Sequence, residues 1–123
     1  MSNVIDVQPK TLDLALYAGD GVDFDLVCVD SNNSPIDLSG SIEAQIRLDR
    51  SDASSSLADF AADMDQAQFG TVGLSLTGDQ TQELITDESG KFTGVWDVQW
   101  TPTGKQPRTL CQGKVECVAD VTR

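Results

Sequence analysis

The chain has 123 residues, 39% of them hydrophobic and 23% charged, a composition typical of one folded domain and not of a disordered segment. Twenty acidic residues, eight basic residues and no histidine give a formal net charge of −12. Such a chain repels nucleic-acid phosphates and anionic lipid, which makes both poor partners, and the lack of histidine excludes histidine-based triads and most zinc sites.

The opening residues have neither the basic nor the apolar stretch of a secretory signal, and no run of about 18 apolar residues occurs. The three cysteines, Cys28, Cys111 and Cys117, lie in apolar runs without a CxxC spacing. This odd count favours free, buried thiols and folding in a reducing compartment. We therefore expect synthesis in the cytoplasm, no membrane partner and no cofactor.

Residues 1–10 are polar and predict an exposed N-terminal arm, followed by a single domain over residues 11–123. The domain begins with a strand that stops at Ala18–Gly21, and a second strand follows at once. One face of the first strand carries Leu12, Leu14 and Leu16, and one face of the second carries Val22, Phe24, Leu26 and Cys28. We expect these two strands to pair as a hairpin.

The next segment is a turn over Asp30–Pro35, which is dense in turn-forming residues, and then a short extended piece at Ile36–Leu38. Gly40 can adopt a positive φ before a third clear strand. Its inward face carries Ile42, Ala44, Ile46 and Leu48. Residues Asp49–Ser56 form a solvated loop of serine, aspartate and alanine.

Leu57–Asp65 fits either a helical face or an alternating strand, and its position among strands favours a short peripheral strand. Thr71–Leu76 predicts a strand with Val72, Leu74 and Leu76 inward. The following segment, Thr77–Ile85, has the one helix signal, because Thr77 and Gln80 have the spacing of a capping box. A helix this short depends on the core for stability.

Both tryptophans lie in the segment Trp96–Trp100, where Trp96, Val98 and Trp100 share one face, so we predict the central core strand here. A turn over residues 101–107 returns the chain into a last strand, whose inward face carries Val115, Cys117, Ala119 and Val121. About seven to eight short strands with one short helix predict an all-β fold, an antiparallel immunoglobulin-like β-sandwich, with a small barrel as the alternative.

Six sequence strings, in this order, resemble those of a family of bacteriophage β-sandwich domains. These domains form the N-terminus of siphophage baseplate upper proteins and occur in lower tail fibre proteins and related small virion proteins. The strings are Leu12-x-Leu14-x-x-Tyr17-x-Gly19-Asp20, Pro35–Gly40, Ile42-x-Ala44-Gln45-Ile46-Arg47, Gly73–Leu76, Trp96–Val98, and Gly113-x-Val115 with Asp120–Thr122. The resemblance extends from Thr11 to Arg123.

The resemblance implies a non-enzymatic structural protein of a tailed-phage virion, in the tail or baseplate or at a fibre attachment, with head decoration on the outer capsid surface as the alternative. The implied partners are other virion proteins, such as a tail, baseplate or major capsid protein, together with further copies of the chain in the particle. The chain ends with the sandwich, so we expect contact with other virion proteins and not host recognition.

The residues themselves indicate no catalytic site. Acidic pairs such as Asp23 and Asp25 alternate with core positions and belong to a solvated strand face. A calcium site from Asp49, Asp52, Asp59, Asp63 and Asp65 remains an alternative without EF-hand spacing. Carbohydrate binding, another alternative, needs exposed rings, and Tyr17 is the one free candidate. For protein contacts we expect the arm residues Val4, Ile5 and Val7 to dock on a neighbour.

Overall fold

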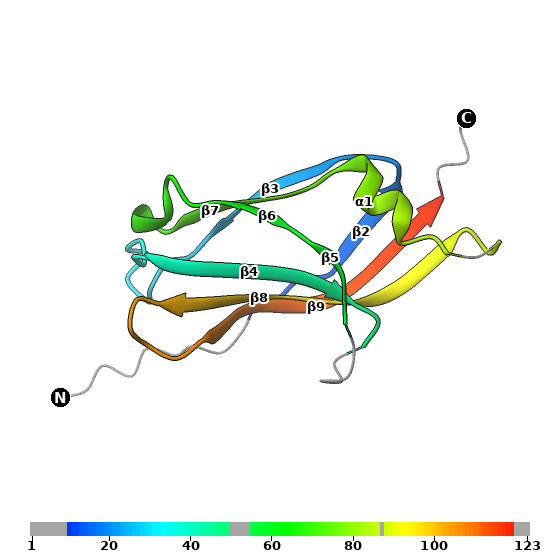
Figure 1. Ribbon diagram of the computed structural model, residues 1–123. Coiled ribbons are helices and arrows are strands. Elements are labelled where there is room, and N and C mark those ends of the chain that lie inside the picture. The colour runs from blue at the N-terminus through cyan, green and yellow to red at the C-terminus, as the bar shows by residue number, and fades with distance from the viewer. Residues whose placement is uncertain (1–9, 50–54, 87, 120–123) are drawn as a thin grey trace.

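The computed structural model describes residues 10–49, 55–86 and 88–119, which form two facing sheets (Figure 1). Sheet A has the strand order β1–β9–β8–β4–β5, with β2 also paired to β9, and sheet B has the order β3–β7–β6. The strands of sheet A are β1 Lys10–Thr11, β2 Leu14–Ala18, β4 Gly40–Arg47, β5 Ser56–Asp59, β8 Lys91–Pro102 and β9 Arg108–Ala119. Those of sheet B are β3 Val22–Val27, β6 Ala61–Asp63 and β7 Thr71–Leu76. This is an immunoglobulin-like β-sandwich, as predicted.

The tryptophan strand β8 is central, as predicted, because it pairs with β4 on one side and β9 on the other. Trp96 is only 1% exposed and lies edge-on to Phe24, with ring centroids 6.0 Å apart. Phe60 packs on Trp96 at 5.7 Å. The indole of Trp100 donates to the Ser39 carbonyl at 3.1 Å. The aromatic core thus joins both sheets.

The hairpin predicted between the first two strands is wrong. β2 pairs in parallel with β9 in sheet A, whereas β3 pairs antiparallel with β7 in sheet B. The turn between them packs on the buried side chain of Thr81, whose hydroxyl accepts from the Gly19 N–H at 3.0 Å and lies 2.9 Å from the Asp20 carbonyl. The turn is thereby fixed as a crossing from one sheet to the other.

The predicted helix is confirmed as α1, Gly78–Glu83, and a 3₁₀ turn, η1, covers Ala67–Phe69. The capping box forms in both directions: Gln80 N–H donates to the Thr77 hydroxyl at 3.1 Å, and Thr77 N–H donates to the Gln80 side-chain oxygen at 2.8 Å. Leu84 follows the helix and is buried. Because α1 is so short, this anchor and Thr81 hold it on the sandwich.

A kink separates β1 from β2, although both pair with β9 in one continuous register. The Leu12 carbonyl accepts from the Trp96 indole at 2.7 Å, and the Asp13 carboxylate accepts from Lys114 N–H at 2.9 Å. A Cβ on Gly113 would lie 2.0 Å from the Leu12 oxygen, so this position requires glycine. The predicted inward orientation of Leu12 is wrong, since its side chain is 44% exposed and its carbonyl faces the core instead.

One lateral side of the sandwich is closed by a strand that changes sheets (Figure 1). β5 belongs to sheet A and β6 to sheet B, and Phe60 lies between them. Phe60 is buried and its N–H donates to the Ala44 carbonyl at 2.9 Å. The prediction of peripheral strand over Leu57–Asp65, in preference to helix, is confirmed, and the sheet change was not predicted.

Smaller expectations have mixed outcomes. Gly40 has φ of 128°, as expected, and the inward residues of β7 are buried. Leu48 was predicted to be inward but is exposed, because β4 ends at Arg47. Lys10 was assigned to the arm but belongs to β1. Most of the predicted Asp49–Ser56 loop and Val121 lie outside the described residues.

Candidate interaction surface

The arm residues Val4, Ile5 and Val7, predicted to dock on a neighbour, lie outside the described residues. The described chain begins at Lys10, which pairs with Cys111 at the margin of sheet A. Any arm before Lys10 therefore starts from the β1 side of the sandwich. The role of the three apolar residues stays a prediction.

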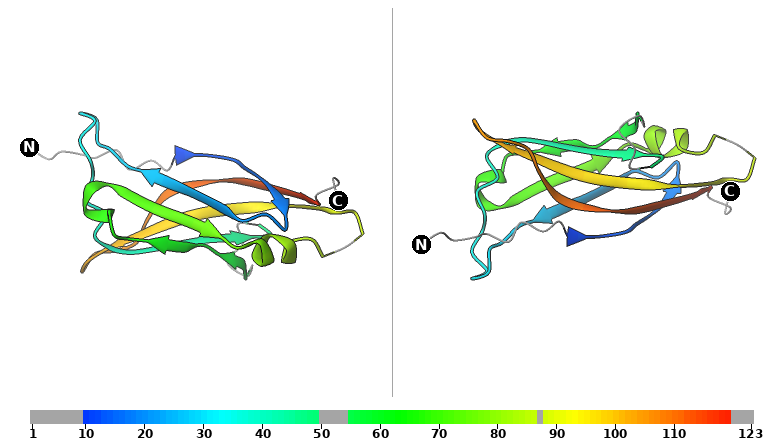
Figure 2. Two further views of the ribbon diagram at one scale, coloured as in Figure 1. Left: turned by 90° about the horizontal axis from the view of Figure 1, so that it is seen from above. Right: turned by 90° about the horizontal axis from the view of Figure 1, so that it is seen from below.

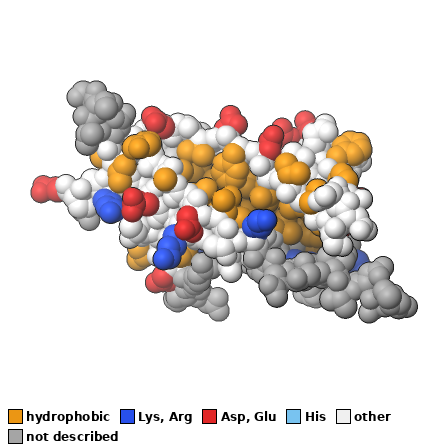
Figure 3. Space-filling view, turned by 180° about the vertical axis from the view of Figure 1, so that it is seen from behind, with side chains coloured by type: hydrophobic (Ala, Val, Ile, Leu, Met, Phe, Trp, Pro, Cys, Tyr) orange, Lys and Arg blue, Asp and Glu red, His pale blue; other side chains and the backbone are white. Residues whose placement is uncertain are grey.

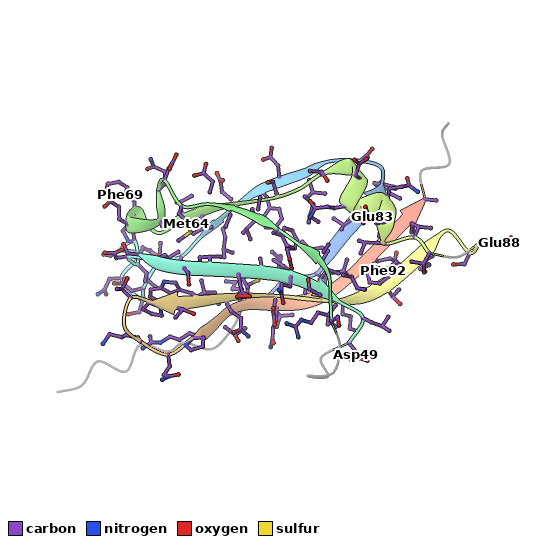
Figure 4. All side chains as sticks on the ribbon, in the orientation of Figure 1. Asp49, Met64, Phe69, Glu83, Glu88 and Phe92 are labelled. Carbon is purple, nitrogen blue, oxygen red and sulfur yellow. The ribbon has the colours of Figure 1, made fainter. Side chains whose placement is uncertain are left out.

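The candidate calcium ligands are not brought together. Asp49 lies at the C-terminal end of β4, whereas Met64, between Asp63 and Asp65, lies toward the opposite end of the molecule (Figure 4). The Asp63 carboxylate accepts the Asp65 N–H at 3.0 Å, as in a local turn. Across the described ranges no three acidic or cysteine side chains gather as metal ligands, and Asp52 is outside those ranges.

The aromatic residues form no common sugar-binding platform. Trp96 and Trp100 are in the core, at 1% and 9% exposed, as predicted from their shared face. Tyr17 is 57% exposed, as expected, and Phe69 is 58% exposed. These two come from β2 and η1, which lie toward opposite ends of the sandwich, with Phe69 at one tip (Figure 4).

The three cysteines are free thiols. Cys111 and Cys117 are buried, as predicted, while Cys28, just beyond the end of β3, is half-buried. Burial raises the pKa of all three thiols, so less of the reactive thiolate is present near neutral pH than in a free cysteine. This is the reverse of the environment of a nucleophilic cysteine.

Among the carboxylates of the described residues, Asp37 is the one whose pKa is lowered, and a turn explains the shift. The Ser39 hydroxyl donates to Asp37 Oδ1 at 2.5 Å and the Ser39 N–H donates to the same oxygen at 2.9 Å. Both bonds favour the charged form. The group is fully exposed on a surface turn, so its lowered pKa reflects turn structure and marks no cleft for chemistry.

A free sheet edge is the most distinctive surface feature. In sheet B, Val22, Phe24 and Leu26 of β3 are each in register with Leu76, Leu74 and Val72 of β7, respectively, and both rows face inward. The β7 residues are at most 3% exposed, whereas those of β3 are only half-buried. β7 lies between two strands, whereas β3 pairs with β7 alone in the described ranges, so the greater exposure of the β3 row arises at its free outer edge.

We call the side of the sandwich between β3 and β1–β2 the open side. It is lined by Leu14, Phe24 and Leu26, the half-buried inward residues at the margins of the two sheets. Figure 2 shows β1 and β2 beside β3 on this side. The view from behind, in Figure 3, shows hydrophobic side chains gathered in the middle of this face.

The described cations lie on one side of the sandwich, whereas acidic residues occur on both sheets. All six described cations belong to sheet A or to the β8–β9 turn: Lys10, Arg47, Lys91, Lys105, Arg108 and Lys114. The charged residues within the strands of sheet B are Asp23, Asp25 and Asp63, all exposed. In Figure 3 acidic side chains lie along the upper margin of the face, which is the sheet B side. The open side is therefore apolar with an acidic border on β3.

The sequence prediction missed this surface because it paired β2 with β3. That pairing would have used the β3 edge and covered the half-buried apolar row. The alternation of apolar and acidic residues in Val22–Asp25 identifies the strand and its faces, but it contains no signal for which strand lies beside it.

No protein-family model and no curated protein matches the chain. Among solved structures, a chain in the crystal structure of ICOS in complex with ICOS-L and an anti ICOS-L VNAR domain is similar over 91% of this chain, with 12% sequence identity and a TM-score of 0.42. The match spans 55% of that chain. Within the described residues, no helix has the length and apolar character needed to cross a membrane.

Proposed function

We propose that the chain is a non-enzymatic structural protein of a tailed-phage virion, in the tail or baseplate or at a fibre attachment, and that it acts through protein–protein contacts. The ordered sequence strings that resemble phage β-sandwich domains support the particle assignment. The contact role draws its support from the open side, where a sheet edge and an apolar row are exposed together.

The exposed carboxylates fit a contact role better than catalysis. Asp23 and Asp25 lie on the outer face of β3, away from the core, and the hollow that Asp23 lines together with Ser75 is shallow and open to solvent. The thiols have raised pKa values through burial, which disfavours nucleophilic chemistry. The features of this chain that a partner protein can bind are its charged surface and its free strand edge.

Head decoration is the second candidate, and the acidic surface is the observation that favours it. A net charge of −12 on a small sandwich gives a highly charged unit for repeated attachment to a capsid lattice. Tail and head locations differ in symmetry, so they require very different numbers of copies per particle.

The copy number of this chain in purified particles, relative to the major capsid protein, tests the proposal by quantitative mass spectrometry. A small number that matches tail symmetry is expected for the baseplate or fibre role. A number comparable with the capsid protein would assign the chain to head decoration instead. Absence from particles would reject both virion roles.

The arm residues provide a second test. Deleting residues 1–8 should leave the melting temperature of the isolated protein nearly unchanged, because the described sandwich begins at Lys10. Incorporation into particles should fall, since Val4, Ile5 and Val7 would no longer dock on a neighbour. Unchanged incorporation with an unchanged melting temperature would remove the arm from the contact.

A further inference from the structure

We propose that the free edge of β3 accepts an extended segment of a partner protein in which apolar residues alternate with lysine or arginine. The segment adds a strand to sheet B, directs its apolar side chains into the open side, and places its cations beside Asp23 and Asp25. This binding mode rests on the contact role proposed above, because it requires that the chain binds another protein. It adds the chemistry of the segment that binds.

The backbone of β3 is suited to strand addition. In an antiparallel pair every second residue directs its N–H and C=O away from the partner strand. The six residues of β3 pair with β7 alone in the described chain, so an alternate set of these groups remains on the outer edge. Unpaired edge groups are a template for a further strand.

The apolar row supplies the driving force. Phe24 and Leu26 on β3 face inward but are only half-buried, and Leu14 of β2, also half-buried, packs on the same core from sheet A. Side chains of an added strand alternate in direction, so every second residue points toward this opening. Covering the row would bring β3 to the burial that its in-register partners on β7 already have.

Charge selects the partner. On the outer face, an added strand places its remaining side chains about 5 Å from those of β3, where opposite charges attract and like charges repel. The exposed residues there are Asp23, Asp25 and Val27, and sheet B has no described cation to neutralise the two aspartates. Lysine or arginine at these positions is favoured, and aspartate or glutamate is disfavoured.

The same two aspartates disfavour binding of the chain's own segments at the β3 edge. Asp6 lies between Ile5 and Val7, so the arm would bring a carboxylate to the aspartates of β3 if its apolar residues faced inward. Two copies paired through their β3 edges would oppose Asp23 and Asp25 with the same residues. Acidic residues on an exposed edge thus limit self-association while leaving a basic partner able to bind.

The test uses the full chain and fluorescently labelled eight-residue peptides with blocked ends. One peptide alternates valine with lysine, a second alternates valine with glutamate, and a third has a proline in the middle of the valine–lysine sequence. The protein variants are Asp23→Lys with Asp25→Lys, and a control with the same charge change away from β3. The control combines Glu43→Lys on β4 with Glu88→Lys in the turn before β8, both positions being exposed. Binding is measured by anisotropy, and protection of β3 amides by hydrogen exchange in NMR.

The wild-type protein should prefer the lysine peptide over the glutamate peptide by about tenfold, the size expected when two attractive cross-strand charge pairs are exchanged for two repulsive ones. The β3 double variant should reverse that preference, the control variant should retain it, and the proline peptide should bind weakly. Bound lysine peptide should protect outer-edge amides of β3.

Binding of neither peptide to the wild-type protein, or equal binding of both peptides to every variant, would overturn the proposal. If the outer-edge amides of β3 are already protected in the free wild-type protein and lose that protection when residues 1–8 are deleted, the arm is the occupant. If their protection increases with protein concentration, a second copy of the chain is the occupant. Either result would also overturn it. None of these outcomes changes the copy number in particles, so the virion proposal is tested separately.

Discussion

The two lateral sides of the sandwich are built from similar apolar strands but end differently. On one side the chain passes from β5 to β6 through Phe60, which is 7% exposed and packs on Trp96. On the other, β2 and β3 belong to different sheets, and Phe24, which packs on the same tryptophan, remains half-buried.

Both sides have a phenylalanine against Trp96, so residue type does not explain the difference. The path of the chain between the two sheets does. At Phe60 the chain itself bridges the two sheets along their margin, so the side chain there is covered from both. At the open side the connection is the tight turn at Gly19–Asp20, at the end of the strands, and it leaves their length uncovered. A partner strand can therefore bind at the open side without displacing anything described.

The largest expected effect is on the closed side. Phe60→Ala should lower the free energy of unfolding by about 3–5 kcal/mol, because it leaves a cavity beside Trp96 that the bridging chain prevents from collapsing. Denaturant unfolding followed by tryptophan fluorescence measures this. Phe69→Ala is the control: its ring is 58% exposed, so a change within about 0.5 kcal/mol is expected. Equal losses at both positions would contradict the assigned closed side.

Next in size is Gly113→Ala, which acts at the sheet A margin of the open side. The added Cβ would meet the Leu12 oxygen at 2.0 Å, so the kink between β1 and β2 must shift. A loss near the upper end of about 1–3 kcal/mol is expected. The matched control is Gly21→Ala, where the nearest atom would lie at 3.7 Å, and a change below about 1 kcal/mol is expected. Near-ultraviolet circular dichroism should report the altered environment of Trp96.

Thr81→Val tests the crossing that separates β2 from β3. It removes the hydroxyl that bonds to Gly19 and lies beside the Asp20 carbonyl, so these part-buried backbone groups lose their partner from α1. We expect a loss of about 1–2 kcal/mol, and a smaller loss for Thr81→Ser, which keeps the hydroxyl. Thermal unfolding of both variants measures this, and equal stability of the valine variant and the wild type would mean that the turn does not depend on Thr81.

The smallest effect concerns reactivity and leaves stability unchanged. Cys28, half-buried next to the end of β3, should react with iodoacetamide before the buried Cys111 and Cys117, as read by peptide mass mapping. Because burial raises the Cys28 pKa, its rate should rise at a higher pH than that of a free cysteine. Faster labelling of Cys111 or Cys117 than of Cys28 in the native protein would contradict the greater exposure of Cys28 beside the free edge of β3.

Much of the local structure could be predicted from the sequence. The capping box at Thr77 and Gln80, the strand of Trp96 and Trp100, and the inward face of β7 all follow from side-chain types at fixed spacing. The candidate surface was not predictable in this way. Leu12 was assigned inward from its alternation, yet the Trp96 indole holds its carbonyl at the core, a contact between residues 84 positions apart.

Neighbouring residues and composition are enough to identify the strand segments, the cap of the helix and the strongly acidic surface, because each depends on side-chain types at fixed spacing or on residue counts. The pairing of β2 with β9 and of β3 with β7, the closure of one side by Phe60, and the free edge of β3 are visible only in the folded chain. Strand pairing depends on contacts between distant segments that compete for the same backbone groups, and the alternation within a strand is the same whichever partner prevails.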